Sequence, residues 1–366
     1  MKWSIYTGKI AGIKLFIHWT LIFFLLWIGF NSFRSGGNIN EMYFSILFMI
    51  SVFICVLLHE LGHALTAKKL GYETKNITLL PIGGLAQMTE IPEKPKHELA
   101  VAISGPIVNL IIGSILLPIS IYLNGISEID LSRVNNLSGF IINLTIVNFS
   151  LAFFNLLPAF PMDGGRVLRS FLAWKSNDRV KATQIASNLG KVMAVIFFVT
   201  GVFFNPILAL IGVFIFIMAH SENQIVKSKE YLSDYKVSDV LMKNFHSLQS
   251  DDKLENAINL LLNVQASDFV VFKNEKVVGT LSRDNIISAL SENGKEILIE
   301  KAMNQNFKTV NIDFKLNEIY PTILSNGKSI IPVYDNGKFM GIIDGQNIAE
   351  FLLLKNTENK RKNVQV

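Results

Sequence analysis

Two histidines and a glutamate lie close together near the end of a long apolar stretch. His59 and His63 are four residues apart, so on a helix their imidazoles point to one side, and Glu60 directly follows the first of them. This H-E-x-x-H pattern is typical of a zinc site in which the histidines bind the metal and the glutamate takes a proton from zinc-bound water. The apolar run that carries it, at about 42–65, is long enough to cross a bilayer.

A catalytic zinc usually has three protein ligands, so the two histidines need a third. The candidate is Asp163, which lies in the stretch NLLPAFPMDGGR at 155–166. Two prolines before it and two glycines after it would break a regular helix and bring a side chain into the membrane. Taken alone, the stretch fits a turn with Asp163 as a helix N-cap equally well. The incomplete zinc site at the same expected depth favours the ligand role.

Membrane helices have to position these residues. Half of the residues are hydrophobic and only 17% are charged, well below the usual 25% or so. We expect spans at about 15–30, 42–65, 99–123 and 137–157, and one or two more within 192–219. Asn205-Pro206 interrupts the last stretch and basic residues flank both of its ends, which favours a hairpin and six spans over a single helix and five.

The segments between the spans are polar or basic. Residues 1–14 are basic and amphipathic, 158–191 reads as a basic loop, and 71–98 contains β-like pieces at 76–80 and 85–89 around a turn with Gly83-Gly84. The loops on the other side hold only Arg34 and Arg133. The positive-inside rule therefore predicts that both termini and the C-terminal domain are cytoplasmic.

The charge balance and the cysteine content exclude several classes of function. Membrane topology accounts for the net charge of +5, and no basic patch with interleaved aromatics indicates nucleic acid. The single cysteine, Cys55, excludes an intramolecular disulfide and a cysteine-based zinc site, and we expect it to be a small buried hydrophobe.

The C-terminal part contains an internal repeat of about 60 residues. We expect a linker at 223–235, two similar α/β units at about 236–292 and 297–355, and a polar tail at 356–366. Each unit runs in the order helix, strand, strand, helix, with strands such as 268–272 and 275–281 in the first unit.

The motifs resemble a known family. His59-Glu60-Leu61-Gly62-His63, combined with Asn155-x-x-Pro158-x-x-Pro161-x-Asp163-Gly164-Gly165, resembles the site-2 protease family of intramembrane zinc metalloproteases, in its prokaryotic branch with a C-terminal pair of CBS domains. The resemblance implies a multi-pass α-helical membrane domain of about six transmembrane helices with a small membrane-associated β segment at 1–222, and an α/β CBS tandem at 236–355.

The resemblance also implies roles for individual residues. His59, His63 and Asp163 would bind one Zn²⁺ per chain, and Glu60 would act as the general base. Asn155 would help to hold the scissile carbonyl, and the Gly83-Gly84 stretch would receive the substrate as an added strand. The expected substrates are transmembrane segments of other proteins within the lipid bilayer, cut in regulated intramembrane proteolysis.

CBS pairs often bind adenine nucleotides, but this chain departs from the nucleotide-binding pattern. The acid that would hold the ribose is expected three residues after a Ser or Thr that follows the last strand of each unit. Both units have an asparagine there instead: Asn285, three residues after Ser282, and Asn347, three residues after Asp344. A CBS-mediated homodimer or a role in gating the substrate is an equal alternative to nucleotide sensing.

Two other functions stay open. A membrane-anchored zinc protease with a water-facing site would take its third ligand from a later glutamate, which the later spans lack. A CBS-gated transporter or channel would not need the motif at 59–63 together with Asp163. The remaining polar residues have structural interpretations: His18 hydrogen-bonds within the bundle, Gly105-Pro106 and Asn109 form a kink and a packing contact, Asn148 forms an interhelical hydrogen bond, and Arg166 and Arg169 anchor the fourth span.

Overall fold

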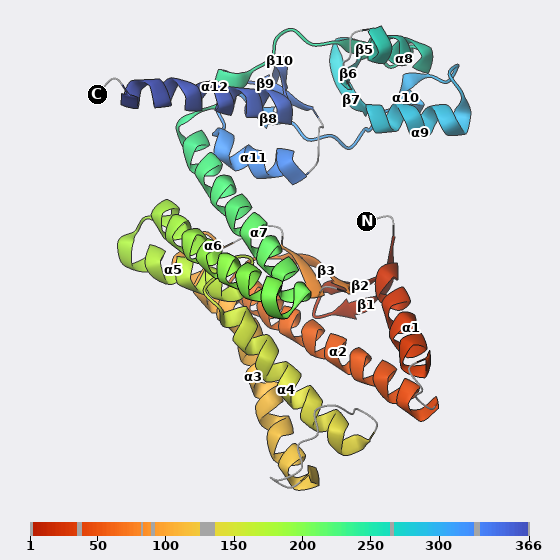
Figure 1. Cartoon of the computed structure of the whole chain (residues 1–366). Coiled ribbons are helices and arrows are strands. Elements are labelled where there is room, and N and C mark those ends of the chain that lie inside the picture. Colours follow the sequence, from red (N-terminus) through yellow and green to blue (C-terminus); the bar gives the residue numbers. More distant parts are fainter. Residues whose placement is uncertain are drawn as a thin grey trace. The chain divides into compact units, whose positions relative to one another are not determined.

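The computed structural model describes residues 3–34, 39–81, 83–88, 92–124, 136–263, 267–325 and 330–364. The chain divides into two compact units, Met1–Gln224 and Ile225–Val366, which are drawn in sequence colours in Figure 1. Thr89, at the end of a predicted strand, and Arg133, in a predicted loop, lie outside the described residues. Each unit is described separately below.

The first unit begins with strands where a basic segment and the start of a membrane span were predicted. β1 (Ser4–Ile10) and β2 (Ile13–His18) form a hairpin, and β2 pairs in parallel with β3 (Thr74–Leu80), which pairs with β4 (Gly83–Met88). The sheet order is β1-β2-β3-β4. The prediction for 15–18 is wrong because these residues belong to β2, which pairs with strands on both sides. Burial alternates only at the start of the strand, where Ile13 and Leu15 are buried and Lys14 is exposed.

Five of the described helices are long and apolar enough to cross a membrane. They are α2 (Ile39–Lys69), α3 (Pro95–Asn124), α4 (Leu137–Leu156), α6 (Arg179–Phe204) and α7 (Pro206–Tyr231). The shorter apolar helix α1 (Trp19–Arg34) precedes them. The predicted hairpin at Asn205 is confirmed, since α6 and α7 are separate helices and Ser187 Oγ of α6 donates to the carbonyl of Ala219 in α7 at 2.6 Å.

A further helix replaces part of the predicted loop at 158–191. α5 (Asp163–Ser176) follows α4 after six residues and ends at Asn177, which has the left-handed conformation typical of a helix C-terminus. Asp178 then caps α6 by accepting from the backbone N–H of Lys181. The loop prediction is therefore wrong for 163–176, where Asp163 becomes the first residue of a helix, and for 179–191, which belong to α6.

The second unit consists of two similar halves. The first has a sheet of β5 (Ser247–Gln249), β6 (Asp268–Lys273) and β7 (Lys276–Ser282) with helices α8 (Leu254–Asn263), α9 (Arg283–Asn293) and α10 (Ile299–Ala302). The second has β8 (Val310–Asn311), β9 (Ile331–Asp335) and β10 (Lys338–Ile343) with α11 (Leu316–Ser325) and α12 (Gly345–Val364). The predicted repeat is thus visible as two three-stranded sheets with flanking helices.

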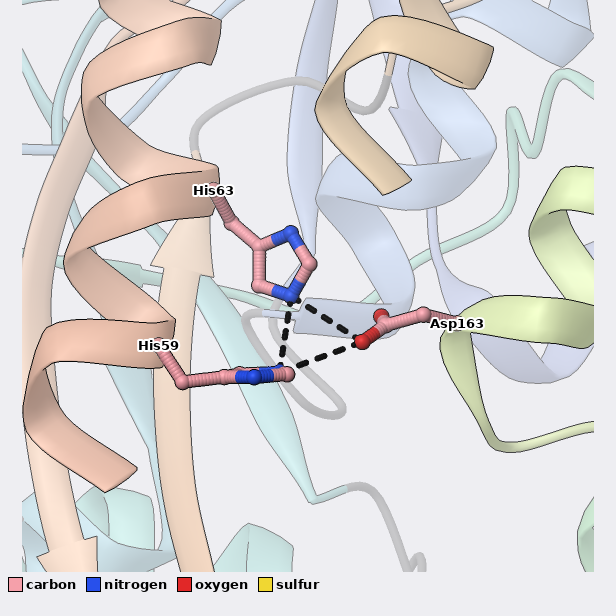
Figure 2. A group of neighbouring side chains, drawn as sticks. All are labelled: His59, His63 and Asp163. Atoms are coloured by element: carbon pink, nitrogen blue, oxygen red, sulfur yellow. Dashed lines mark hydrogen bonds and ion pairs between the residues drawn. The ribbon is translucent and has the colours of Figure 1, made fainter. Parts of the chain in front are cut away.

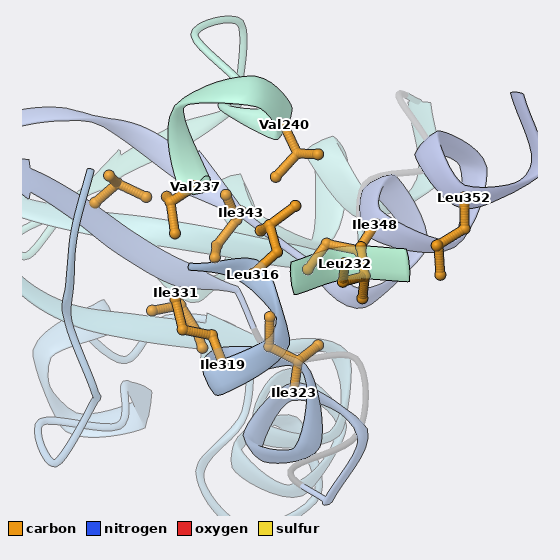
Figure 3. Packing of buried hydrophobic residues seen from close by; sticks show 11 residues of the cluster. Leu232, Val237, Val240, Leu316, Ile319, Ile323, Ile331, Ile343, Ile348 and Leu352 are labelled. Atoms are coloured by element: carbon orange, nitrogen blue, oxygen red, sulfur yellow. The ribbon is translucent and has the colours of Figure 1, made fainter. Parts of the chain in front are cut away.

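The core of the second half also takes residues from the start of the unit. Leu232 in η1 (Leu232–Asp234) and Val237 in η2 (Val237–Val240) pack with Leu316, Ile343 and other aliphatic side chains (Figure 3). Burying a side chain of this size stabilises a fold by about 1.5–3 kcal/mol. The segment that follows α7 is therefore part of the second half's core.

Candidate metal centre

Three predicted ligands converge between α2 and the start of α5. His59 and His63 lie on one face of α2, and Asp163 reaches them from α5 (Figure 2). The two Nε2 atoms are 3.1 Å apart, and Asp163 Oδ2 lies 3.2 Å from His59 Nε2 and 3.1 Å from His63 Nε2. Asp163 does not cap its helix, because the N-cap residue is Met162. The structure therefore brings these three side chains together across about a hundred residues of sequence.

Hydrogen bonds set the tautomers of both imidazoles. His63 Nδ1 lies 2.7 Å from the backbone carbonyl of Val101, which can only accept, so this nitrogen carries the hydrogen. His59 Nδ1 lies 2.7 Å from Asn109 Oδ1 and donates to it in the same way. In neutral imidazoles both Nε2 atoms are then free of hydrogen and available to a metal.

The donor set fits a zinc ion. Two imidazole nitrogens and a carboxylate oxygen are ligands that zinc takes in catalytic sites. Donors around a tetrahedral zinc at about 2.0–2.1 Å lie roughly 3.3 Å from one another, close to the 3.1–3.2 Å separations observed. Three lone-pair atoms that meet at this distance without a hydrogen between them repel one another, and a cation relieves the repulsion. His59, His63 and Asp163 would hold that ion.

Gly105 on α3 has a role that the sequence analysis missed. A Cβ at this position would lie 2.2 Å from His63 Nε2 and 2.7 Å from His59 Nε2. The glycine thus lets the backbone of α3 come against the atoms that would bind the metal. Asn109, one turn later, is a hydrogen-bond partner of His59 rather than a packing contact. Their i, i+4 spacing indicates that both lie on one face of α3, but not that this face packs against α2.

Glu60 lies next to β4, the last strand of the membrane-unit sheet. A Cβ on Gly84 would lie 2.4 Å from Glu60 Cγ and 3.1 Å from Glu60 Oε1, so the strand backbone passes beside the carboxylate. Gly83 has a φ of +134°, a conformation that favours glycine. β4 pairs with β3 on one side, and no described strand pairs with its other side. The open strand edge and the candidate general base are therefore neighbours.

Two of the predicted polar residues are not joined to this centre. Asn155, half-buried near the end of α4, makes no side-chain hydrogen bond to any described residue, and its predicted role stays a prediction. His18 lies at the end of β2 with Nδ1 2.8 Å from the hydroxyl of Thr20, so its hydrogen bond is to a residue two positions later and not across the bundle as predicted. Cys55 is buried, as predicted.

Arg169 is a buried ion-pair residue and not a surface anchor. Only 1% of it is exposed; its Nε donates to Glu98 Oε1 at 2.9 Å, and its Nη1 donates to Glu222 Oε1 at 2.5 Å. Burial alone would lower the pKa of Arg169, but the two carboxylates outweigh it and raise this pKa above its usual value. The cluster joins α5 to α3 and α7. Its sequence signal was two glutamates at the ends of apolar runs.

Comparisons with known proteins identify both parts of the chain. The profile of Peptidase family M50 matches residues 47–197, and that of the CBS domain matches 237–292 and 295–354. The zinc metalloprotease MJ0392 of Methanocaldococcus jannaschii is 33% identical over 365 residues, which cover 99% of this chain and 100% of that protein. Stage IV sporulation protein FB of Bacillus subtilis is 34% identical over 121 residues, 33% of this chain and 38% of its own.

A solved structure is also similar to part of the chain. The site-2 protease from Methanocaldococcus jannaschii is 39% identical and covers 60% of this chain and 95% of its own, with a TM-score of 0.45. The expected fold class, the zinc cofactor and the metalloendopeptidase activity are confirmed by the family matches, and the non-enzyme alternative is wrong. The chain is a membrane protein that belongs to Peptidase family M50, the site-2 protease family of zinc metalloproteases, and carries a C-terminal pair of CBS domains.

Proposed function

We propose that this enzyme cleaves a peptide bond in or near the transmembrane segment of other membrane proteins. The observation that carries the proposal is the convergence of Asp163 with His59 and His63 of α2, a helix long and apolar enough to cross a membrane. Ile54 and Leu58, on the same helix just before and beside His59, are 51% and 40% exposed. Aliphatic side chains exposed beside the metal ligands are better suited to contact with lipid chains than with water. The motif lies well before the charged end of α2 at Lys68.

The chemistry follows from the groups around the three ligands. A bound zinc supplies polarisation of the scissile carbonyl and acidification of a water molecule. Glu60 would accept a proton from the attacking water and return it to the leaving amine. His59 Nδ1 donates its hydrogen to Asn109 Oδ1, and His63 Nδ1 donates its hydrogen to the carbonyl of Val101. Both Nε2 atoms therefore stay oriented toward Asp163.

The open edge of β4 supports a mode of substrate binding. A transmembrane helix hides its peptide bonds in internal hydrogen bonds, so it has to unwind before water can attack it. The unwound backbone can pair with β4 as an added strand, which places a peptide bond beside Glu60 at Gly83-Gly84. In this mode Asn155, near the end of α4, helps to hold the scissile carbonyl.

For the CBS pair we propose regulation from the cytoplasm. The lysines and arginines of 1–14, 66–98 and 158–191 support a cytoplasmic location of both termini. Ser282 and Asp344 cap α9 and α12 by accepting from the backbone N–H of Asn285 and Asn347, so both already have partners where a nucleotide ribose would bind. Exposed apolar residues favour a homodimer instead: Ile287 and Leu290 on α9, and Leu353 and Leu354 on α12.

Reconstitution tests the proposed function. The full chain would be placed in liposomes with a single-span substrate protein, and mass spectrometry would map the cut. We expect the wild type to cut within or next to the span, Glu60→Gln to bind zinc but not to cut, and the exposed Glu73→Gln to behave as wild type. Cleavage of a soluble unfolded polypeptide but not of the span would contradict the proposal and support a water-facing protease.

A further inference from the structure

A chain of buried polar side chains leads away from His59 into α4. Asn109 Oδ1 accepts from His59 Nδ1, and Asn109 Nδ2 donates to Asn148 Oδ1 at 3.3 Å. Asn148 Nδ2 donates to the backbone carbonyl of Leu144 at 2.8 Å and lies 3.4 Å from Cys55 Sγ. Both asparagines are 0% exposed and lie within membrane-spanning helices. We propose that Asn148 is a positioning residue for the zinc site and acts on His59 through Asn109.

The order of donors and acceptors gives this chain one direction. The carbonyl of Leu144 can only accept, so it orients the amide of Asn148 with Nδ2 toward it and Oδ1 toward Asn109. Oδ1 can also only accept, so it turns Nδ2 of Asn109 toward Asn148 and leaves Oδ1 facing His59. His59 must then keep its hydrogen on Nδ1. Each link is fixed by an acceptor-only atom, starting from the backbone of α4.

The reversed amide would harm metal binding. If Asn109 turned by half a rotation, its NH₂ group would face His59 Nδ1 and favour the tautomer with the hydrogen on Nε2. That hydrogen would occupy the nitrogen that is meant to face Asp163. A buried polar group without a hydrogen-bond partner costs free energy in a membrane. The amide of Asn109 therefore takes the orientation that gives it a hydrogen bond to Asn148. His63 needs no such chain, because the backbone carbonyl of Val101 fixes it directly.

Zinc affinity of the full chain in detergent, measured by competition with a chelator, tests the inference. Asn148→Leu removes the acceptor for Asn109 Nδ2, and we expect zinc to bind about tenfold more weakly, the usual effect of losing an outer partner of a metal ligand. Asn109→Asp keeps an acceptor for His59 Nδ1 on either carboxylate oxygen, while its other oxygen faces Asn148 Oδ1. In that background Asn148→Leu should not weaken zinc binding, since no amide remains to be oriented and the contact between two acceptor oxygens is removed.

Control variants separate positioning from packing. Asn143→Leu removes a half-buried asparagine of the same helix whose side chain, among the described residues, donates to the carbonyl of Gly139 alone, and it should leave zinc affinity unchanged. Asn148→Ser keeps a hydroxyl that can bond to the carbonyl of Leu144 but does not reach Asn109. It should therefore weaken zinc binding as Asn148→Leu does, and it replaces Asn148→Leu as the test if that variant does not fold. The inference would be overturned if Asn148→Leu weakened zinc binding equally in the wild type and in Asn109→Asp. It would also be overturned if neither Asn148→Leu nor Asn148→Ser weakened zinc binding in the wild type.

The inference rests on the proposed zinc ligands, and the same titration keeps the two apart. If the wild type bound zinc and His59→Ala bound it equally well, the proposed metal site would fail. If His59→Ala lost zinc but Asn148→Leu kept the wild-type affinity, only the role of Asn148 would fail.

Discussion

Replacing Gly105 by alanine should remove the metal while keeping the fold. The added carbon would lie 2.2 Å from His63 Nε2 and 2.7 Å from His59 Nε2, whereas an ordinary contact needs about 3.5 Å. The nitrogens would have to retreat by roughly 1 Å, several times the 0.2 Å or so that metal–ligand distances tolerate. Because both imidazoles move, we expect zinc affinity to fall by more than about 100-fold, the upper end of the loss for a single outer partner.

The fold itself should tolerate this change. Alanine favours a helix over glycine by about 1 kcal/mol, and the imidazoles can rotate away from the new methyl group. The assay is a chelator-competition titration with thermal unfolding of the metal-free protein beside it. Gly113→Ala, in the same helix α3, is the matched control. Its new carbon would lie 3.1 Å from the ring of Phe149 in α4, a tight contact that a shift of the ring by a few tenths of an ångström relieves, and it lies away from the ligand atoms. Wild-type zinc affinity in Gly105→Ala would refute the placement of α3 against the ligand atoms.

Three further variants test other parts of the structure. Arg169→Met leaves the carboxylate of Glu98 buried without its main partner, and the free energy of unfolding in detergent should fall by about 3–5 kcal/mol; adding Glu98→Gln should recover much of it. Gly84→Ala should displace Glu60 and slow cleavage of a transmembrane reporter about 100-fold or more, with normal zinc content. Leu316→Ala should destabilise the C-terminal unit by about 2–5 kcal/mol in calorimetry and leave the zinc content unchanged.

Features that depend on local periodicity were predictable from the sequence. The spacing of His59 and His63 places both on one helix face, and hydropathy locates α2, α3 and α4 to within a few residues. Asn205-Pro206 marks the hairpin because proline cannot donate the hydrogen bond that a continuous helix needs. Asp163 was found by asking which acidic residue could complete a zinc site, and the structure places it beside the histidines.

Features that depend on partners distant in the chain were not predictable. The strand at 13–18 runs without a polar break into α1, so hydropathy alone joins the two. From the sequence, Arg169 is a basic residue of a predicted loop. Its partners Glu98 and Glu222 lie on other helices, so the ion pairs are evident only in the folded structure. Gly105 and Asn109 reveal their roles only when α3 is packed on α2, because a close approach of backbone to side chain leaves no trace in composition.

Zinc content of the purified full chain tests the central claim most directly, with wild type, Asp163→Ala and Glu60→Gln compared in one preparation. We expect about one zinc in wild type and in the inactive Glu60→Gln, and far less in Asp163→Ala, because the two histidines alone do not make a three-ligand site. Full zinc content and cleavage activity in Asp163→Ala would show that the third ligand lies elsewhere and would contradict the site described above.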